Sequence, residues 1–166
     1  MKNFLLVLFG LIIITIGTTG FKEDRHHPDF ALGSQFPEIK IFNDSMCVWL
    51  GDDKSDSYVL ISFWRSTDAQ SRIQCKAYND AVAGIKAIDS KKIEYVAVNL
   101  DPDKTLSEEI IKCDNLNSIW QYSVADAENA ALKQITDSEF AGISMLVDRT
   151  GTIIAYNPSI AQLGNL

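Results

Sequence analysis

The sequence predicts an α/β domain, and three features of the 166-residue chain carry this prediction. The apolar run 58–64 is typical of a strand buried on both faces of a sheet, and a helix-period pattern follows it from 68 to 88. A second apolar strand is expected at 93–100. Two further apolar runs flank Asp148-Arg-Thr-Gly151, which predicts a β-hairpin with Gly151 at a position of positive φ.

The N-terminus has the features of an export signal. Lys2 precedes an apolar run that is followed by Thr18-Thr19-Gly20, a small-residue cleavage site. We therefore expect residues 1–20 to be a signal peptide, 21–33 a polar lead-in and 34–166 one domain, exported to the periplasm, the cell surface or the medium. The alternative is an uncleaved anchor, because residues 3–21 are uncharged and a spanning helix needs about 20 residues.

Charge and composition exclude several classes of partner and ligand. The net charge of −7 argues against nucleic acid and anionic membrane surfaces, so membrane contact is expected only through the N-terminal segment if it is uncleaved. His26 and His27 are adjacent in the sequence, and side chains of adjacent residues rarely bind the same metal ion. Asp101 and Asp103 precede a predicted helix, where acids usually act as caps. No metal and no cofactor are expected.

The remaining elements follow from apolar period and capping signals. Two short strands, 36–42 and 47–50, flank a turn and predict a hairpin ahead of the main sheet. A capping box at Thr105 predicts a short helix, residues 119–123 an extended segment, and 126–135 a further helix. On the helix 68–88, the broad apolar stripe expected to pack on the sheet comprises Ile73, Ala77, Ala81, Ile85 and Ile88, with Tyr78 and Val82 beside them.

The segment Phe63-Trp-Arg-Ser-Thr-Asp-Ala-Gln-Ser-Arg72 resembles the thioredoxin superfamily, in particular its exported TlpA-like (AhpC/TSA-related) branch, whose pattern is roughly F-W-A-S-W-C-x-x-C-R. The Asp148-x-x-Gly151 hairpin and the Gly33-x-x-x-Pro37 segment resemble the same branch. The resemblance covers about residues 33–160. It implies a thioredoxin-like fold, with a central mixed β-sheet flanked by α-helices and an N-terminal β-hairpin.

The chain departs from this family at the residues that carry its chemistry. Asp68 and Ser71 stand where the family has its two cysteines, and neither can attack a disulfide or resolve a mixed one. Gly142 stands where the family keeps a cis-proline facing that pair. A cis bond before a residue other than proline costs about 2.5–4 kcal/mol, so we expect a trans bond at Gly142.

The replacement residues also have a purely structural interpretation. Thr67 and Gln70 fit a capping box, with Asp68 placing negative charge at the positive end of the helix dipole. We favour stabilisation of the helix start over a new catalytic role for Asp68 as the explanation of these residues. Hydrolysis through Ser71 and Asp68 has little support, because a serine nucleophile needs an adjacent base and both histidines lie in the N-terminal lead-in.

Three separated cysteines, Cys47, Cys75 and Cys113, complete the candidate chemistry. The chain contains no C-x-x-C, and the odd number leaves at least one thiol free or paired with another chain. Cys75 follows Ser71 by one helical turn, where the dipole effect has faded. It is expected to be a small buried hydrophobe, the alternative being a reactive thiol.

These observations lead to two hypotheses about function. The first is a binding or scaffolding module without oxidoreductase activity, which recognises a protein or peptide through Trp64, Thr67, Asp68, Ser71, Gly142, Ile143 and Ser144. The second is a thiol-dependent oxidoreductase or peroxidase that uses Cys75, or Cys47 paired with Cys75 or Cys113. No catalytic residue is assigned. Residues 157–166 are too few for the long final helix of thioredoxins, which would leave one face of the sheet open to a partner.

Overall fold

The computed structural model describes residues 30–37, 39–42, 47–50, 57–89, 92–124 and 140–166. For 39–42 and 47–50 it describes the backbone alone. Within the described residues the chain forms a five-stranded sheet and a separate two-stranded sheet. The larger sheet has the strand order β5-β4-β3-β6-β7. A mixed central sheet is therefore present, as the sequence predicts.

The middle of the large sheet is the strand that the sequence marks most strongly. β3 (Tyr58–Trp64) pairs in parallel with β4 (Ile93–Asn99) and antiparallel with β6 (Ser144–Val147). The edges are β5 (Gln121–Ser123), parallel to β4, and β7 (Ile153–Tyr156), antiparallel to β6. β3 contributes side chains to a hydrophobic core on each face of the sheet, which explains why it needs apolar residues toward both faces.

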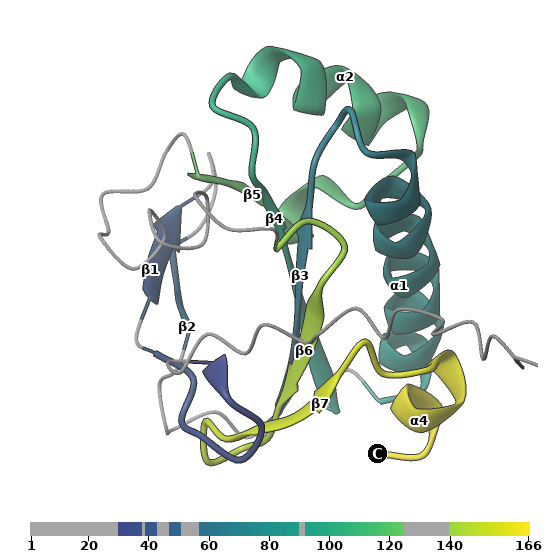
Figure 1. Ribbon diagram of the computed structural model, residues 1–166. Helices are drawn as coiled ribbons and strands as arrows, with labels where there is room; N and C mark the ends of the chain where they lie inside the picture. Colours follow the sequence, from purple (N-terminus) through teal and green to yellow (C-terminus); the bar gives the residue numbers. More distant parts are fainter. Residues whose placement is uncertain (1–29, 38, 43–46, 51–56, 90–91, 125–139) are drawn as a thin grey trace, which may run out of the picture.

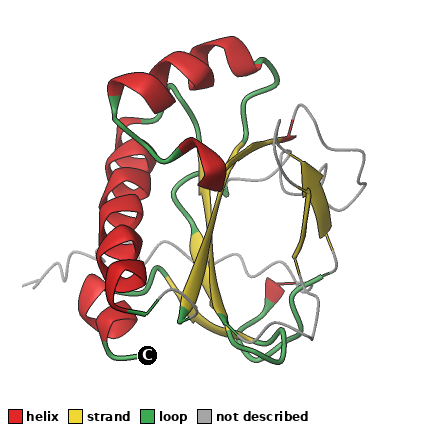
Figure 2. Cartoon of the chain, turned by 180° about the vertical axis from the view of Figure 1, so that it is seen from behind, coloured by secondary structure: helices red, strands yellow, loops and turns green. Residues whose placement is uncertain are grey.

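Helices and the hairpin lie on opposite faces of this sheet (Figure 1). One face carries α1 (Ala69–Ile88) and the short α4 (Ile160–Gly164). Across the sheet lie β1 (Ile39–Phe42) and β2 (Cys47–Leu50), the antiparallel hairpin expected from the sequence. Figure 2 shows the same layers from behind, with α2 (Lys104–Cys113) at the end of the molecule where α1 begins.

Each face of the sheet has its own hydrophobic core. The core on the α1 face is centred on Leu60, Trp64, Tyr78 and Val82. On the other face, Phe30 packs edge to face on Phe36 and Phe140, with ring centroids 5.5 and 5.3 Å apart. Phe30 belongs to the segment expected to be a polar lead-in, yet it is only 3% exposed. The packed domain therefore includes at least Phe30.

The expected face of α1 is confirmed in part, because Tyr78 and Val82 are buried and Ile85 packs against the core, but the stripe does not pack on the sheet along its whole width. Ile73 and Ile88 are 64% and 92% exposed, and the residues that α1 buries are Ser71, Cys75, Tyr78, Asn79 and Val82. The expected stripe and the buried face both have helical spacing. Alanine and isoleucine occur on more than one side of this helix, so spacing alone does not identify the buried side. The rotation is decided by the turn out of β3, which requires Ser71 to point inward.

Two predicted helix starts are also corrected, each by one or two residues. α1 is capped by Asp68 instead of Thr67, and α2 by Asp103 instead of Thr105. A carboxylate accepts N–H groups from the first turn as well as a hydroxyl does, so several acceptors in a row leave the boundary undecided. A full capping box occurs instead at α4, between Ser159 and Gln162.

Other expectations are confirmed or fall outside the described residues. The hairpin of β6 and β7 is present with Gly151 at φ 81°. A 3-10 turn, η2 (Ser118–Trp120), replaces the first part of the extended segment before β5. The predicted helix 126–135 and the N-terminal apolar run lie outside the described residues. Among the helices that are described, none is both long and apolar enough to span a membrane.

Candidate functional site

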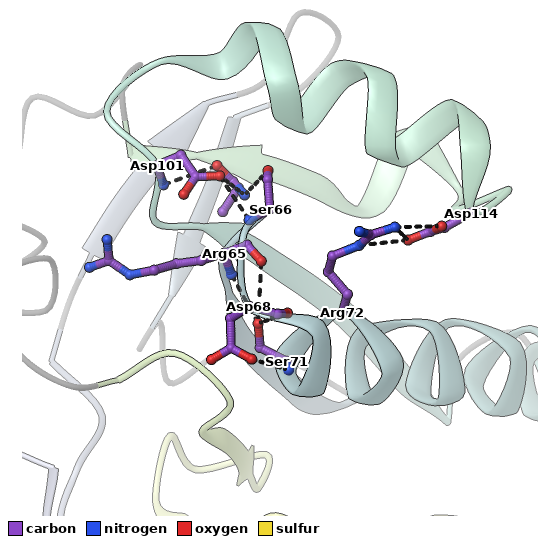
Figure 3. Close-up of polar contacts among 8 residues, drawn as sticks. Arg65, Ser66, Asp68, Ser71, Arg72, Asp101 and Asp114 are labelled. Atoms are coloured by element: carbon purple, nitrogen blue, oxygen red, sulfur yellow. Dashed lines mark hydrogen bonds and ion pairs between the residues drawn. The ribbon is translucent and has the colours of Figure 1, made fainter.

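The candidate site is the turn between β3 and α1, which consists of residues 65–68 (Figure 3). The strand ends at Trp64, whose carbonyl accepts the N–H of Leu100 from the end of β4 at 2.9 Å. The Asp68 N–H then donates to the Arg65 carbonyl at 3.1 Å and closes the turn. Residues 65–68 are thereby held at the carboxyl ends of the two parallel strands.

Ser71 is part of the framework of this turn. Its hydroxyl accepts the Arg65 N–H at 3.1 Å and lies 3.1 Å from the Asp68 carbonyl, to which it can donate. The side chain is 1% exposed. Because the hydroxyl is committed on both sides and buried, Ser71 is available neither as a nucleophile nor for partner contact.

Asp68 caps α1 and remains partly exposed. One carboxylate oxygen, Oδ1, accepts the N–H groups of Gln70 and Ser71 at 2.9 and 3.1 Å. In Figure 3 the side chain lies at the start of α1. A carboxylate at a helix N-terminus is stabilised as an anion, and as a pure acceptor it offers no electron-exchange chemistry. The site therefore presents a hydrogen-bonded carboxyl group at the tip of α1.

A polar cluster that sequence analysis missed holds the other side of the turn. Asp101 Oδ2 accepts the Ser66 N–H at 2.9 Å and the Asn99 side-chain amide at 3.0 Å. Asn99 in turn accepts the Asp101 N–H at 3.1 Å. Asp101 is thus a brace across the ends of β3 and β4. Across the described ranges, no group of three potential metal-ligating side chains is brought together.

The motif arginine also has a structural partner. Arg72 makes a bidentate ion pair with Asp114, with nitrogen-to-oxygen distances of 2.9 to 3.2 Å. Asp114 is the C-cap of α2. This pair fixes the start of α1 against the end of α2, and the sequence carried no signal that joined the two residues.

The Gly142 loop faces the helix tip, as the alignment with the family pattern implies. A Cβ at Gly142 would lie 3.8 Å from both Ser71 Cβ and Gln74 Oε1. Gly142 has φ 82°, and no cis peptide bond occurs in the described chain, in agreement with the expected trans bond. The Gly142 N–H donates to the Phe63 carbonyl at 2.8 Å, so this loop extends the pairing of β3 with β6.

Burial changes the set of residues that a partner could touch. Trp64, Ser71 and Ser144, all expected in the binding surface, are each 1% exposed. Trp64 packs in the core on the α1 face. We therefore correct the expected surface. Thr67 is exposed, and Asp68, Gly142 and Ile143 are partly exposed.

Cys75 is in an environment that suppresses thiol chemistry. It is 1% exposed, and burial raises its pKa from 9.0 to about 11. The Tyr95 hydroxyl lies 3.5 Å from its sulfur. Cys113, at the end of α2, is exposed, and both of these thiols are free. The side chain of Cys47 is outside the described residues.

The sheet order, the α1 crossover and the facing Gly142 loop define a thioredoxin-like fold of the thiol-disulfide oxidoreductase type. No protein-family model matches the chain, and no curated protein matches it by sequence. The assignment therefore rests on solved structures, and it confirms the resemblance expected from the sequence at the level of the fold.

Three solved structures illustrate the likeness. A thioredoxin-like protein from Parabacteroides distasonis is 19% identical, over 81% of this chain and 94% of its own, with a TM-score of 0.62. The thioredoxin domain of a thiol-disulfide oxidoreductase from Bacteroides vulgatus is 25% identical over the same shares, also at 0.62. StoA from Bacillus subtilis is 16% identical over 78% and 93%, at 0.58.

Proposed function

We propose that this protein is an exported binding or scaffolding module that has kept a thioredoxin-like fold and lost disulfide oxidoreductase activity. Its partner would be a protein or peptide that contacts the tip of α1 and the facing loop. The contact surface consists of Thr67, Asp68, Gly142 and Ile143. For convenience we call these four residues the tip surface.

One observation carries the proposal. The two positions at which the family has its thiols are occupied by oxygen side chains whose hydrogen bonds hold the turn and the first turn of α1. Disulfide exchange requires a thiolate that attacks and a thiol that resolves. At this turn neither is present, and the substitutes are used for folding.

Cys75 does not supply the missing chemistry. A thiol with a raised pKa is almost entirely protonated near neutral pH, and burial keeps disulfides of other proteins from reaching its sulfur. These two properties favour the binding function over an oxidoreductase or peroxidase that uses Cys75. Cys113 is exposed and is the last residue of α2. Among the described residues, no second thiol forms a disulfide with it.

The enzymatic alternative is tested by thiol reactivity and by turnover. The purified domain should not accelerate the reduction of insulin by dithiothreitol. Iodoacetamide should modify Cys75 at least about a hundredfold more slowly in the folded domain than in the urea-unfolded chain, because burial raises the pKa of this thiol to about 11 and lowers its thiolate fraction. Insulin reduction by the wild type, or rapid alkylation of Cys75, contradicts the proposal.

Partner binding is tested by site-specific photo-crosslinking in the native cell. A photoreactive phenylalanine analogue replaces Thr67 in the tip surface, or Ile88 at the opposite end of α1 as the matched exposed control. We expect a discrete adduct from position 67 and none of the same mass from 88. Equal labelling from both positions, or no adduct from 67, argues against a binding function at this surface. Cell fractionation of the same strains tests export.

A further inference from the structure

The link between β7 and α4 contains a residue whose backbone conformation is unusual. Asn157 has φ 42°, in the left-handed region that residues other than glycine seldom adopt. Its N–H donates to the Ser144 carbonyl at 2.7 Å, and its side-chain Oδ1 accepts the Ser144 N–H at 2.7 Å. The Asn157 side chain thus takes the place of a backbone carbonyl at the end of the β6–β7 ladder.

The same side chain also contacts α1. Gln74 Nε2 donates to Asn157 Oδ1 at 3.0 Å. Gln74 lies one turn after Ser71, and its Oε1 is 3.8 Å from the position of a Cβ on Gly142. One oxygen atom of Asn157 therefore joins the helix side and the loop side of the tip surface.

A second contact fastens the same segment to the helix. The Tyr78 hydroxyl donates to the Pro158 carbonyl at 2.8 Å. Tyr78 follows Gln74 by one turn, so two successive turns of α1 hold residues 157 and 158. In this second bond the link contributes only a backbone carbonyl. The contact between the link's side chains and the Ser144 backbone is therefore made by Asn157.

We propose that Asn157 is a positioning residue that fixes the spacing between the tip of α1 and the Gly142–Ser144 loop. The inference rests on the proposed binding function, because that spacing sets how Thr67 and Asp68 lie relative to Gly142 and Ile143. The left-handed backbone costs free energy that glycine would not incur. This left-handed conformation occurs at a residue whose side chain accepts hydrogen bonds from Gln74 on α1 and from Ser144 in the loop.

A matched control exists in the same chain. Asn115 is also left-handed, with φ 51°, but it follows the end of α2, where its N–H bonds to the Lys112 carbonyl at 3.2 Å. Left-handed residues are common at helix ends. Asn115→Gly therefore relieves a similar backbone cost without touching the loop.

The test is amide hydrogen exchange, followed by NMR, at Gly142 and Ile143 in the full exported domain. These two N–H groups bond to the Phe63 and Phe140 carbonyls, so loss of the Asn157 oxygen removes neither bond directly. Asn157→Gly should speed their exchange about tenfold, the effect of losing roughly one buried hydrogen bond from loop closure. Asn157→Asp, which keeps an acceptor, should restore wild-type rates.

Global unfolding and the control variant make the result decisive. The urea midpoint of Asn157→Gly should match the wild type, because glycine suits the left-handed backbone and offsets the lost contacts. Asn115→Gly should leave loop exchange unchanged. Unchanged exchange in Asn157→Gly, or equal acceleration by Asn115→Gly, overturns the inference.

Crosslinking separates this inference from the proposed function. If the wild type crosslinks from position 67 and Asn157→Gly does so equally, binding stands and the role of Asn157 fails. If the wild type forms no adduct, the binding function fails, and exchange alone then decides whether Asn157 fixes the loop. Loss of the adduct in Asn157→Gly with recovery in Asn157→Asp supports both.

Discussion

At the scale of single residues, Asp68 and Ser71 have structural roles in the turn between β3 and α1. Ser71 is placed by the helix to reach both the Arg65 N–H and the Asp68 carbonyl, a use for which a small hydroxyl suffices. Asp68 closes the first turn of α1 with its carboxylate. Side chains at these two positions thus contribute to stability where the family resemblance would place chemistry.

The cost of removing the Ser71 hydroxyl measures this structural use. Ser71→Ala leaves the Arg65 N–H without its buried acceptor, so the free energy of unfolding should fall by about 1–3 kcal/mol. Urea unfolding gives this value. Ser118→Ala is the control, since Ser118 is exposed at η2 and should change stability by less than about 0.5 kcal/mol. An effect of Ser71→Ala no larger than that of the control contradicts the framework role.

Cys75 predicts a dependence of stability on pH. Its pKa is raised to about 11 by burial in the folded state, whereas the unfolded thiol ionises near 9.0. Between these values the folded state binds more protons, so stability falls as pH rises. Burial raises the pKa of Tyr78 and Tyr95 and acts in the same direction.

Urea unfolding at pH 8 and pH 10 tests this dependence. The wild type should lose stability over this interval, and Cys75→Ala should lose less, because the contribution of the Cys75 thiol is then removed. Identical losses in the two proteins would show that the Cys75 thiol is not protected in the fold.

At the scale of the elements, α1 is oriented by its first turn. Its buried face comprises Ser71, Cys75, Tyr78, Asn79 and Val82, while an apolar stripe that includes Ile73 and Ile88 faces outward. The hydrogen bond from the Arg65 N–H to the Ser71 hydroxyl and the ion pair of Arg72 with Asp114 fix the rotation at the N-terminal end. Hydrophobic period alone does not choose between two faces that both contain small and apolar residues.

Substitutions on the two faces of α1 should differ in their effect. Val82 is fully buried, and Val82→Ala should lower the free energy of unfolding by about 2 kcal/mol through lost burial and a small cavity. Ile73→Lys and Ile88→Lys should each change it by less than about 0.5 kcal/mol. Thermal or urea unfolding of the three variants decides the matter. A large loss from either lysine variant would place that isoleucine in an interface.

At the scale of the whole molecule, the fold keeps the geometry of the thiol-disulfide oxidoreductase type around a site that lacks the thiols. The Gly142 loop still faces the helix tip, with Ser71 Cβ 3.8 Å from a Cβ at that glycine. β3 and the loop remain paired by the Phe63 and Gly142 backbones. A fold of this type does not by itself imply the activity.

Restoring the two thiols tests how complete that geometry is. Asp68 and Ser71 are one helical turn apart, with the Ser71 N–H 3.1 Å from Asp68 Oδ1, and a disulfide needs Cα atoms within about 7 Å. Asp68→Cys with Ser71→Cys should form an intramolecular disulfide on oxidation, detected by mass after alkylation. Asp68→Cys with Ser118→Cys is the control and should not form one. Failure of the first pair would show that the turn has changed shape.

The sequence by itself determined the class of fold, the central strand, the hairpin of β6 and β7, and the absence of a C-x-x-C pair. These depend on local period, turn residues and the identity of the side chains. Only the tertiary structure decided that Trp64 is core, that Asp101 braces the turn, and that Arg72 pairs with Asp114. It also brought Asn157 beside Gln74, 83 positions apart. Such contacts join residues distant along the chain, and their geometry exists only once the sheet has been assembled.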